Sequence, residues 1–375
     1  MKTNLREKIY NVIQSLPSPL KYPIVEFVYQ TTSYEKSKAI TPLIMNLFVT
    51  DNCNLLCSHC FYAGHLNKQE KTTLKEIETM IKSLKNPLVS VILTGGETFL
   101  RKDIAEICVL LDKAKTKKVI MPTNGSFTDK VYQQVKEILK RTDLDVAIQL
   151  SLDGPEKTHD HIRGVKGSYE KAIKTLKKLK TIKSNKLSLS ISTTVSKANY
   201  ETIKDFLKET KPLKVFHGIQ FVRSASKHVF NIDKNILSDF DSEDPTLSME
   251  QMEYIQKLVK INNNKATPLL SKTIELVNEY FMKSIKEKKR FMPCTAGYVD
   301  AVVYPDGGVS VCEFTKPFAN LNDFNWDFYK LWTSDKANQM RKKTSVCVCT
   351  HQCNLMNSLR YDKKSIKTLF SNGLN

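Results

Sequence analysis

Hydrophobic and polar residues alternate along the middle of this chain in a pattern that predicts strands and helices in turn. Six short apolar runs, rich in β-branched residues, have the length of buried strands: 43–50, 88–94, 118–122, 144–151, 187–195 and 215–222. The segments between them carry apolar residues at helical spacing, and we expect helices at 74–84, 104–114, 131–139, 168–179 and 203–207. This alternation predicts an α/β fold in which a parallel sheet curls into a partial (β/α)6 TIM-like barrel.

The two ends of the chain follow other patterns. Near the N-terminus, a Pro-Ser-Pro breaker separates two amphipathic segments that predict helices, 4–14 and 23–36. After about residue 224, helices are expected at 249–262 and 270–288, and strands 299–304 and 309–313 flank a Pro-Asp-Gly-Gly turn typical of a hairpin. We therefore expect an N-terminal helical segment, a barrel core, a helical linker region, a cysteine-rich domain and a tail: 1–40, 41–223, 224–290, 291–360 and 361–375.

Composition narrows the class of protein. Of the 375 residues, 41% are hydrophobic and 26% charged, as in a soluble globular protein. No apolar run approaches the roughly 20 residues that cross a bilayer, and the N-terminus lacks the apolar core of a signal peptide. We therefore expect a cytoplasmic protein without a membrane partner. The net charge of +19 suits an acidic substrate or partner. Nucleic-acid binding is disfavoured, because the lysines are spread along the whole chain without a recognisable binding module.

The nine cysteines are clustered rather than dispersed. Three stand at positions 53, 57 and 60, one at 108, and five between 294 and 353. In a cytosolic protein, such clusters indicate metal or redox sites rather than disulfide bonds. Cys108 is different, because it shares an apolar helical face with Ile104, Ile107 and Leu111. We expect it to pack in the core.

Polar, glycine-rich segments follow the first four predicted strands directly. They are 53–60, 95–97, 123–125 and 151–154. The carboxyl ends of parallel strands meet at one rim, where βα folds build their active sites. Behind two glycines that let a ligand approach the backbone, Glu97 can receive an ammonium group.

The three cysteines of the first segment have the spacing C-x-x-x-C-x-x-C, which can place three thiolates around one metal centre. A [4Fe–4S] cluster normally takes four thiolates, so three would leave one iron open to a small chelating ligand. The alternative is a zinc site with His59 or His65 as the fourth ligand.

These segments resemble the motifs of a known family. Residues 53–60 (CNLLCSHC) resemble the cluster signature of the radical S-adenosylmethionine (SAM) superfamily, and 95–98 (GGET) resemble its methionine-binding motif. Residues 151–155 (SLDGP), 159–164 (HDHIRG) and 167–169 (GSY) resemble the branch that carries a C-terminal SPASM or twitch extension. The resemblance runs from about residue 43 to residue 353, with the motifs in the order typical of the family.

The resemblance implies a role for each residue at the rim. Cys53, Cys57 and Cys60 would bind three irons of a [4Fe–4S] cluster, and SAM would chelate the fourth. Arginine suits the SAM carboxylate because its guanidinium is bidentate and always charged. The aromatic candidates fit either the adenine or the hydrophobic core. The implied SAM contacts are Gly95, Gly96 and Glu97 at the ammonium, Ser151 and Arg163 at the carboxylate, Asn124 at the ribose, and Tyr62 and Phe221 near the adenine.

The C-terminal cysteines imply one auxiliary [4Fe–4S] cluster, because five are too few for the two clusters of a full SPASM domain. The implied ligands are Cys294, Cys312, Cys353 and either Cys347 or Cys349. The remaining thiol would be inert or would donate a hydrogen atom to a substrate radical. A zinc knuckle is the alternative for the whole group.

The resemblance implies an enzyme that reductively cleaves SAM to a 5′-deoxyadenosyl radical, which takes a hydrogen atom from a substrate. A peptide or protein is the first substrate expected, as in sulfatase maturation and the maturation of ribosomally synthesised peptides. Dehydrogenation of a small molecule such as an aminocyclitol or a tetrapyrrole is the second. A non-catalytic iron–sulfur or zinc protein that binds nucleic acid is the alternative from another class.

The same interpretation implies two further partners. An external electron donor, a flavodoxin or ferredoxin, would supply the electron that starts SAM cleavage. The 52 residues before Cys53 are fewer than the roughly 80 of a leader-peptide-binding domain. Such a domain is then either missing or supplied by a separate leader-binding partner.

Overall fold

The structure is a computed structural model that describes residues 41–68, 72–223, 246–262, 268–345 and 347–359, with short pieces between 361 and 368. The two helices predicted in residues 1–40 lie outside the described residues, as does most of the predicted tail. Nowhere in the described ranges is there a helix with the length and apolar composition needed to cross a membrane.

Six parallel strands pair in chain order and confirm the predicted α/β fold. All six contribute residues to the lining of one cavity, so the sheet curves around that cavity as a partial barrel. The ends of the strands differ from the predicted ends by no more than two residues. They are β1 (Ile44–Thr50), β2 (Ser90–Gly95), β3 (Lys118–Thr123), β4 (Asp145–Ser151), β5 (Leu187–Val195) and β6 (Phe216–Phe221).

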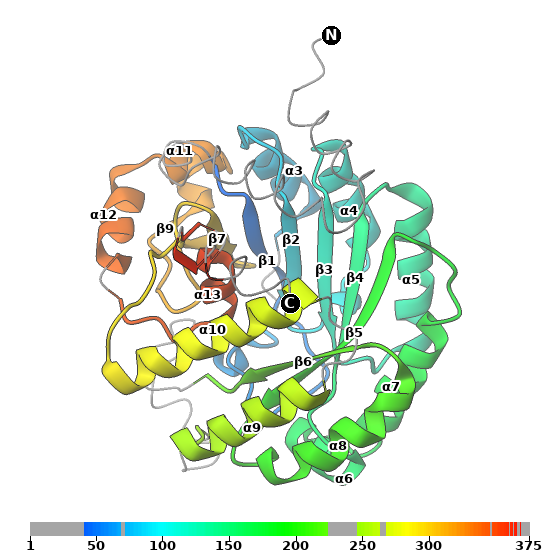
Figure 1. The fold of residues 1–375 in the computed structure, drawn as a ribbon. Helices are drawn as coiled ribbons and strands as arrows, with labels where there is room; N and C mark the ends of the chain where they lie inside the picture. Colours follow the sequence, from blue (N-terminus) through cyan, green and yellow to red (C-terminus); the bar gives the residue numbers. More distant parts are fainter. Residues whose placement is uncertain are drawn as a thin grey trace.

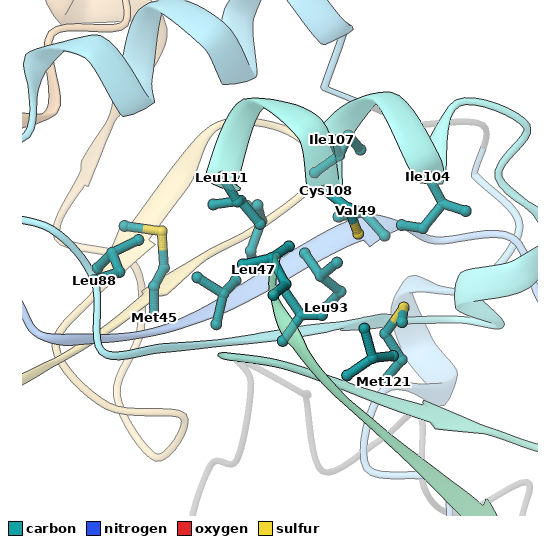
Figure 2. Close-up of a cluster of buried hydrophobic side chains, with 14 of the residues drawn as sticks. Met45, Leu47, Val49, Leu88, Leu93, Ile104, Ile107, Cys108, Leu111 and Met121 are labelled. Atoms are coloured by element: carbon teal, nitrogen blue, oxygen red, sulfur yellow. The ribbon is translucent and has the colours of Figure 1, made fainter. Parts of the chain in front are cut away.

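Helices cover the outer face of this sheet (Figure 1). Apolar side chains that alternate along the strands pack against the apolar faces of the helices and form the main core. Figure 2 shows Cys108 in this core beside Ile104, Ile107 and Leu111, fully buried as predicted. The helices are α3 (Leu74–Ser83), α4 (Ile104–Lys113), α5 (Thr128–Arg141), α6 (Glu156–Arg163), α7 (Ser168–Leu179) and α8 (Ile203–Thr210).

The C-terminal part continues the same sheet, which the sequence did not predict. Strand β7 (Asp300–Val303) pairs in parallel with β1, and β8 (Gly308–Ser310) returns antiparallel as the expected hairpin. A short β9 (Ala319–Asn320) completes a nine-stranded sheet in the order β6-β5-β4-β3-β2-β1-β7-β8-β9. The cysteine-rich region is therefore fixed to the first strand of the barrel.

Helices α9 (Met249–Asn262) and α10 (Pro268–Glu287) confirm the two helices expected after the barrel. A second hydrophobic core joins α9, α10 and the C-terminal helix α13 (Gln352–Leu359) to the end of β6. The remaining helices are α11 (Phe328–Trp332) and α12 (Asp335–Thr344). Short 3-10 turns occur at Ala63–His65, Thr98–Leu100, Tyr200–Thr202, Lys211–Leu213 and Leu321–Phe324.

Candidate functional site

A cavity of about 590 Å³ lies on the concave side of the sheet. Cys53, Cys57 and Cys60 line one part of it, and Cys312 and Cys353 line another. The cavity also collects every residue that was predicted to contact SAM: Tyr62, Gly95, Gly96, Glu97, Asn124, Ser151, Arg163 and Phe221. The structure therefore brings the predicted rim residues and both cysteine groups to a single space.

The first cysteine loop is fixed against the end of β2 by backbone contacts. The Glu97 amide donates to the Asn52 carbonyl at 2.7 Å. A Cβ atom at Gly95 would lie 2.0 Å from the Thr50 carbonyl oxygen, and one at Gly96 would lie 2.2 Å from that of Asn52. The two glycines thus let two loops approach each other, whereas the sequence analysis assigned them to the approach of a ligand.

Two thiols of this loop, those of Cys53 and Cys60, would resist ionisation without a cation. Burial raises the pKa of Cys53 to about 11 and that of Cys60 to about 12. A cationic iron centre coordinates thiolates and would reverse this preference. No three His, Cys, Asp or Glu side chains in the described ranges converge as the ligands of a single metal ion would. Three thiols on one loop facing a cavity fit the donor set of a cluster with one open iron.

Glu97 is buried and its carboxylate is held in one orientation. One oxygen accepts hydrogen bonds from the Thr123 hydroxyl at 2.7 Å and the Phe99 amide at 3.2 Å. The other accepts from the Asn124 amide at 2.8 Å. Burial raises the pKa of Glu97, and these three donors oppose that shift. A carboxylate that is buried but oriented toward a cavity can bind an ammonium group there.

The side chain of Asn124 connects the end of β3 to the cysteine loop. Its amide nitrogen donates to Asn54 Oδ1 at 2.9 Å, and its carbonyl oxygen accepts from the Ser126 amide. The amide group of Asn124 is therefore engaged within the protein, while the residue still borders the cavity.

Arg163 belongs to a buried ionic group that the sequence analysis did not recognise. Its guanidinium lies 2.6 Å from the carboxylate of Asp153 and donates to Cys57 Sγ at 3.5 Å. Asp153 is fully buried and also accepts from the Thr194 amide. Burial opposes its ionisation, yet Arg163 and then His59 lower its pKa overall. The only sequence signal for Asp153 was its place in the segment that follows β4.

Histidines border the same ionic group and are neutral near pH 7. His59 Nε2 lies 3.8 Å from Asp153, and His159 Nδ1 accepts from the Asp153 amide. Burial lowers the pKa of each of these two histidines to about 4. Asp153 is therefore balanced mainly by the single charge of Arg163.

The two aromatic candidates are packed into the walls of the cavity. The ring of Tyr62 lies 5.0 Å from that of Phe48 and is stacked on His65 at 5.2 Å. Phe221 stacks on Phe281 of α10 at 5.4 Å. Both are almost fully buried, as expected of core residues, and both border the cavity as expected of adenine contacts.

The C-terminal cysteines differ in exposure: Cys349 is buried, Cys294 and Cys312 are half-buried, and Cys347 and Cys353 are exposed. The thiols of Cys294 and Cys349 both approach Asn354 Oδ1, at 3.4 and 3.9 Å. Burial raises the pKa of Cys312, and it raises the pKa of Cys349 to about 12. Nearby thiols add to both shifts. Cys347 is exposed and lies outside the cavity lining, whereas the exposed side of Cys353 faces the cavity.

A second ionic group lies between the two cysteine groups. The carboxylate of Glu313 contacts Arg223 at 2.7 Å, His351 at 2.5 Å and the amide of Asn46 at 2.8 Å. The Arg223 guanidinium lies 4.9 Å from the ring centre of Phe61, the residue after Cys60. This group could not be predicted from the sequence, because its members come from distant segments and match no local motif.

Comparison with known families agrees with this arrangement. A partial barrel with thiols at its rim and a second cysteine group beside it defines an iron–sulfur enzyme of the SAM-cleaving class. The model of the radical SAM superfamily matches residues 47–210, and that of the SPASM iron–sulfur cluster-binding domain matches residues 294–354. The chain belongs to the radical SAM superfamily, in the branch with a C-terminal SPASM or twitch domain.

Individual relatives are similar over most of the chain. The antilisterial bacteriocin subtilosin biosynthesis protein AlbA of Bacillus subtilis is 26% identical over 347 residues, which cover 87% of this chain and 70% of AlbA. The Fe-coproporphyrin III synthase of Methanosarcina barkeri is 26% identical over 301 residues, 76% of this chain and 72% of the synthase.

Solved structures share the fold. Streptococcus suis SuiB bound to S-adenosylmethionine superposes with a TM-score of 0.60 at 16% identity, covering 96% of this chain and 84% of SuiB. The structure of anSMEcpe with bound AdoMet superposes with a TM-score of 0.59 at 18% identity. The superposition covers 88% of this chain and 93% of anSMEcpe. These likenesses confirm the predicted barrel with its C-terminal extension.

Family membership confirms the predicted cofactors. They are SAM, a SAM-binding [4Fe–4S] cluster and auxiliary iron–sulfur binding in the C-terminal domain. Membership also favours an enzyme over the non-catalytic iron–sulfur or zinc protein that the sequence analysis kept as an alternative.

Proposed function

We propose that this protein is a radical SAM enzyme that modifies a peptide or protein substrate. The observation that carries the proposal is the single cavity bordered by both cysteine groups, which leaves room for a substrate between a SAM site and an auxiliary site. The relatives support a peptide substrate. AlbA acts in the biosynthesis of the bacteriocin subtilosin, and SuiB has been solved with its precursor peptide SuiA.

Cys53, Cys57 and Cys60 would hold the cluster that leaves one iron open for SAM. When bound, the cluster and SAM supply a 5′-deoxyadenosyl radical. Glu97 would bind the methionyl ammonium, because Thr123 and two backbone amides already fix its carboxylate. Ser151 would meet the SAM carboxylate, since its side chain borders the cavity at the end of β4.

Arg163 would act on both SAM and the cluster. Its charge would attract the SAM carboxylate, and its hydrogen bond to Cys57 would contact a cluster ligand. Asp153 would hold the guanidinium in place. Asn124 would line the ribose side through its backbone, because its amide group already bonds Asn54. Tyr62 and Phe221 would form apolar walls near the adenine.

The auxiliary cluster would be held by Cys294, Cys312, Cys349 and Cys353. We choose Cys349 over Cys347 because Cys349 is buried beside Cys294, whereas Cys347 is exposed. Hydrogen donation by Cys347 or Cys349 gains no support from the geometry, since neither is among the described residues that line the cavity.

Two partners complete the proposal. A flavodoxin or ferredoxin would reduce the cluster, and a separate protein would present the leader of a peptide substrate. A reducing compartment, the cytoplasm, suits a chain whose nine cysteines are all free.

A small-molecule oxidation is the second candidate. The similarity to the Fe-coproporphyrin III synthase covers 76% of this chain and favours a tetrapyrrole among the small molecules.

The test begins with anaerobic reconstitution, a count of iron and sulfide, and a 5′-deoxyadenosine assay with SAM and dithionite. Two clusters predict about eight irons per chain. Mass spectrometry then follows a short peptide encoded beside this gene and, in parallel, coproporphyrin. A mass change on the peptide supports the proposal. A change on the porphyrin alone would replace it with the second candidate, and absence of SAM cleavage would overturn both.

A further inference from the structure

The cavity carries no excess of positive charge even though the chain carries a net charge of +19. No lysine is among the described residues that line it. Its two lining arginines are both paired, Arg163 with Asp153 and Arg223 with Glu313. The positive charge of the chain therefore lies elsewhere, and an acidic partner would find no attraction inside the cavity.

The other acids that line the cavity are engaged as well. The carboxylate of Asp300 accepts hydrogen bonds from Thr295, Asn354 and Asn357. Glu97 accepts three hydrogen bonds and would bind the ammonium of SAM. No charged group in the described lining is left for the substrate. A charged substrate side chain would lose its water there without gaining a partner.

Uncharged polar groups, in contrast, are available. Gln149 on β4 and Ser192 on β5 both line the cavity, and their side chains make no hydrogen bond within the described part of the chain. Ser192 is in register with Ser151, two residues beyond Gln149 on the same face of β4. A glutamine amide donates and accepts at once, which matches the N–H and C=O of a peptide group.

Gly218 on β6 leaves a space next to Ser192, its partner in the sheet. The neighbouring residue His217 points to the opposite face, where it contacts Phe206 and Thr210 of α8. Gly218 therefore faces the cavity, because successive residues of a strand alternate between faces. A Cβ atom there would lie 3.3 Å from the Phe216 ring, so a methyl group requires only a slight shift of that ring, and a larger side chain would extend into the cavity.

The cavity also has apolar walls, and one of them, the Phe216 ring, lies beside Gly218. Ile274 and Val277 of α10 and Phe216 of β6 line the same cavity. Apolar walls and uncharged polar groups together suit a neutral side chain attached to a peptide backbone.

We propose that the cavity binds an uncharged side chain of a peptide substrate in the space beside Gly218, and that Gln149 binds the neighbouring peptide group. The inference rests on the proposed peptide-modifying function and specifies the substrate residue for it. Gly218 then determines substrate specificity, because its missing side chain leaves space for the side chain of the substrate.

The test uses the reconstituted holoenzyme and a library of synthetic peptides with three randomised central positions. Modified members of the library are sequenced by tandem mass spectrometry. The readout is the ratio of the amount of modified peptide to the amount of 5′-deoxyadenosine formed. We expect modification at uncharged residues only. The Gly218→Leu variant should lower the ratio at least tenfold, Gly218→Ala should lower it less, and Gln149→Leu should raise the KM for peptide.

The matched control is Ser188→Leu, which adds the same side chain at an exposed position of β5 outside the cavity lining. Its ratio should equal that of the unchanged enzyme. Modification at lysine or aspartate, or an unchanged ratio in Gly218→Leu, would overturn the inference while leaving a peptide-modifying enzyme. SAM cleavage with no modified peptide at all would instead contradict the proposed function itself.

Discussion

The guanidinium of Arg223 lies 2.7 Å from the carboxylate of Glu313, and this ion pair joins the end of β6 to the C-terminal hairpin. Burial opposes ionisation of Glu313, but Arg223 and then His351 lower its pKa to about 2. The side chains are only 18% and 9% exposed, so water screens the pair weakly. The barrel and the SPASM domain are thus connected by a buried charge pair beside both cysteine groups.

Breaking this pair should destabilise the protein. Arg223→Gln leaves Glu313 buried without its main counter-charge and should lower the free energy of unfolding by about 3 kcal/mol. The double variant Arg223→Gln/Glu313→Gln removes both charges and should lose less than the sum of the single variants. Urea unfolding of the four proteins of this cycle measures the coupling. Additive losses would show that the two side chains do not interact.

The auxiliary site makes a prediction about iron content. Cys349→Ser should lose the iron of the auxiliary cluster, because the Cys349 thiol is buried beside those of Cys294 and Cys312. Cys347→Ser should retain it, because Cys347 is exposed. Iron and sulfide counts with electron paramagnetic resonance of the reconstituted variants measure the difference. The reverse result would move the fourth ligand to Cys347.

A triple variant separates the two cluster sites. Replacement of Cys53, Cys57 and Cys60 by Ala should abolish 5′-deoxyadenosine formation and leave about four irons per chain in the C-terminal domain. The measurement is the same iron count combined with the SAM-cleavage assay. Loss of all iron, or continued cleavage, would contradict the assignment of two independent sites.

Glu97 makes a prediction about SAM binding. Glu97→Ala should weaken SAM binding at least tenfold and spare cluster assembly, because Glu97 belongs to the rim but is not a thiol ligand. Thr123→Val is the milder comparison, since it removes one of three hydrogen bonds that orient Glu97. Equilibrium binding of SAM to the reconstituted variants gives the ranking. Normal affinity in Glu97→Ala would remove this residue from the SAM site.

The sequence predicted the barrel strands and the grouping of the rim residues because both depend on local patterns. Buried strands are apolar runs, and the segments after them must lie at one edge of a parallel sheet. Helix α6 was missed because only Ile162 among its eight residues is strongly apolar. The addition of β7 to the edge of β1 was missed because pairing between distant strands leaves no local signal.

Side-chain pairing was the least accessible part of the site. Asp153 was visible as a loop residue, but its ion pair with Arg163 depends on how α6 packs beside the cysteine loop. Arg223 and Glu313 are 90 residues apart and meet only because the hairpin joins the barrel sheet. Such pairs depend on tertiary packing, which periodicity along the chain cannot supply.

His217 makes a prediction about the dependence of stability on pH. Burial lowers its pKa from 6.5 to about 4, while its ring nitrogens contact the hydroxyls of Thr193 and Thr210. The unfolded chain therefore binds more protons than the folded chain between pH 4 and 6.5. Stability should fall as pH falls through this window, by about 1.4 kcal/mol per pH unit for one histidine.

The variant His217→Gln should show a shallower pH dependence, since one titrating group has been removed. His59 and His159 have similarly lowered pKa values and should keep the remaining slope. Urea unfolding at intervals between pH 5 and 7.5 measures both proteins. Equal slopes would mean that His217 is protonated in the folded protein as readily as in the unfolded chain. Its contact with the two hydroxyls would then have to accommodate the charged ring inside the barrel wall.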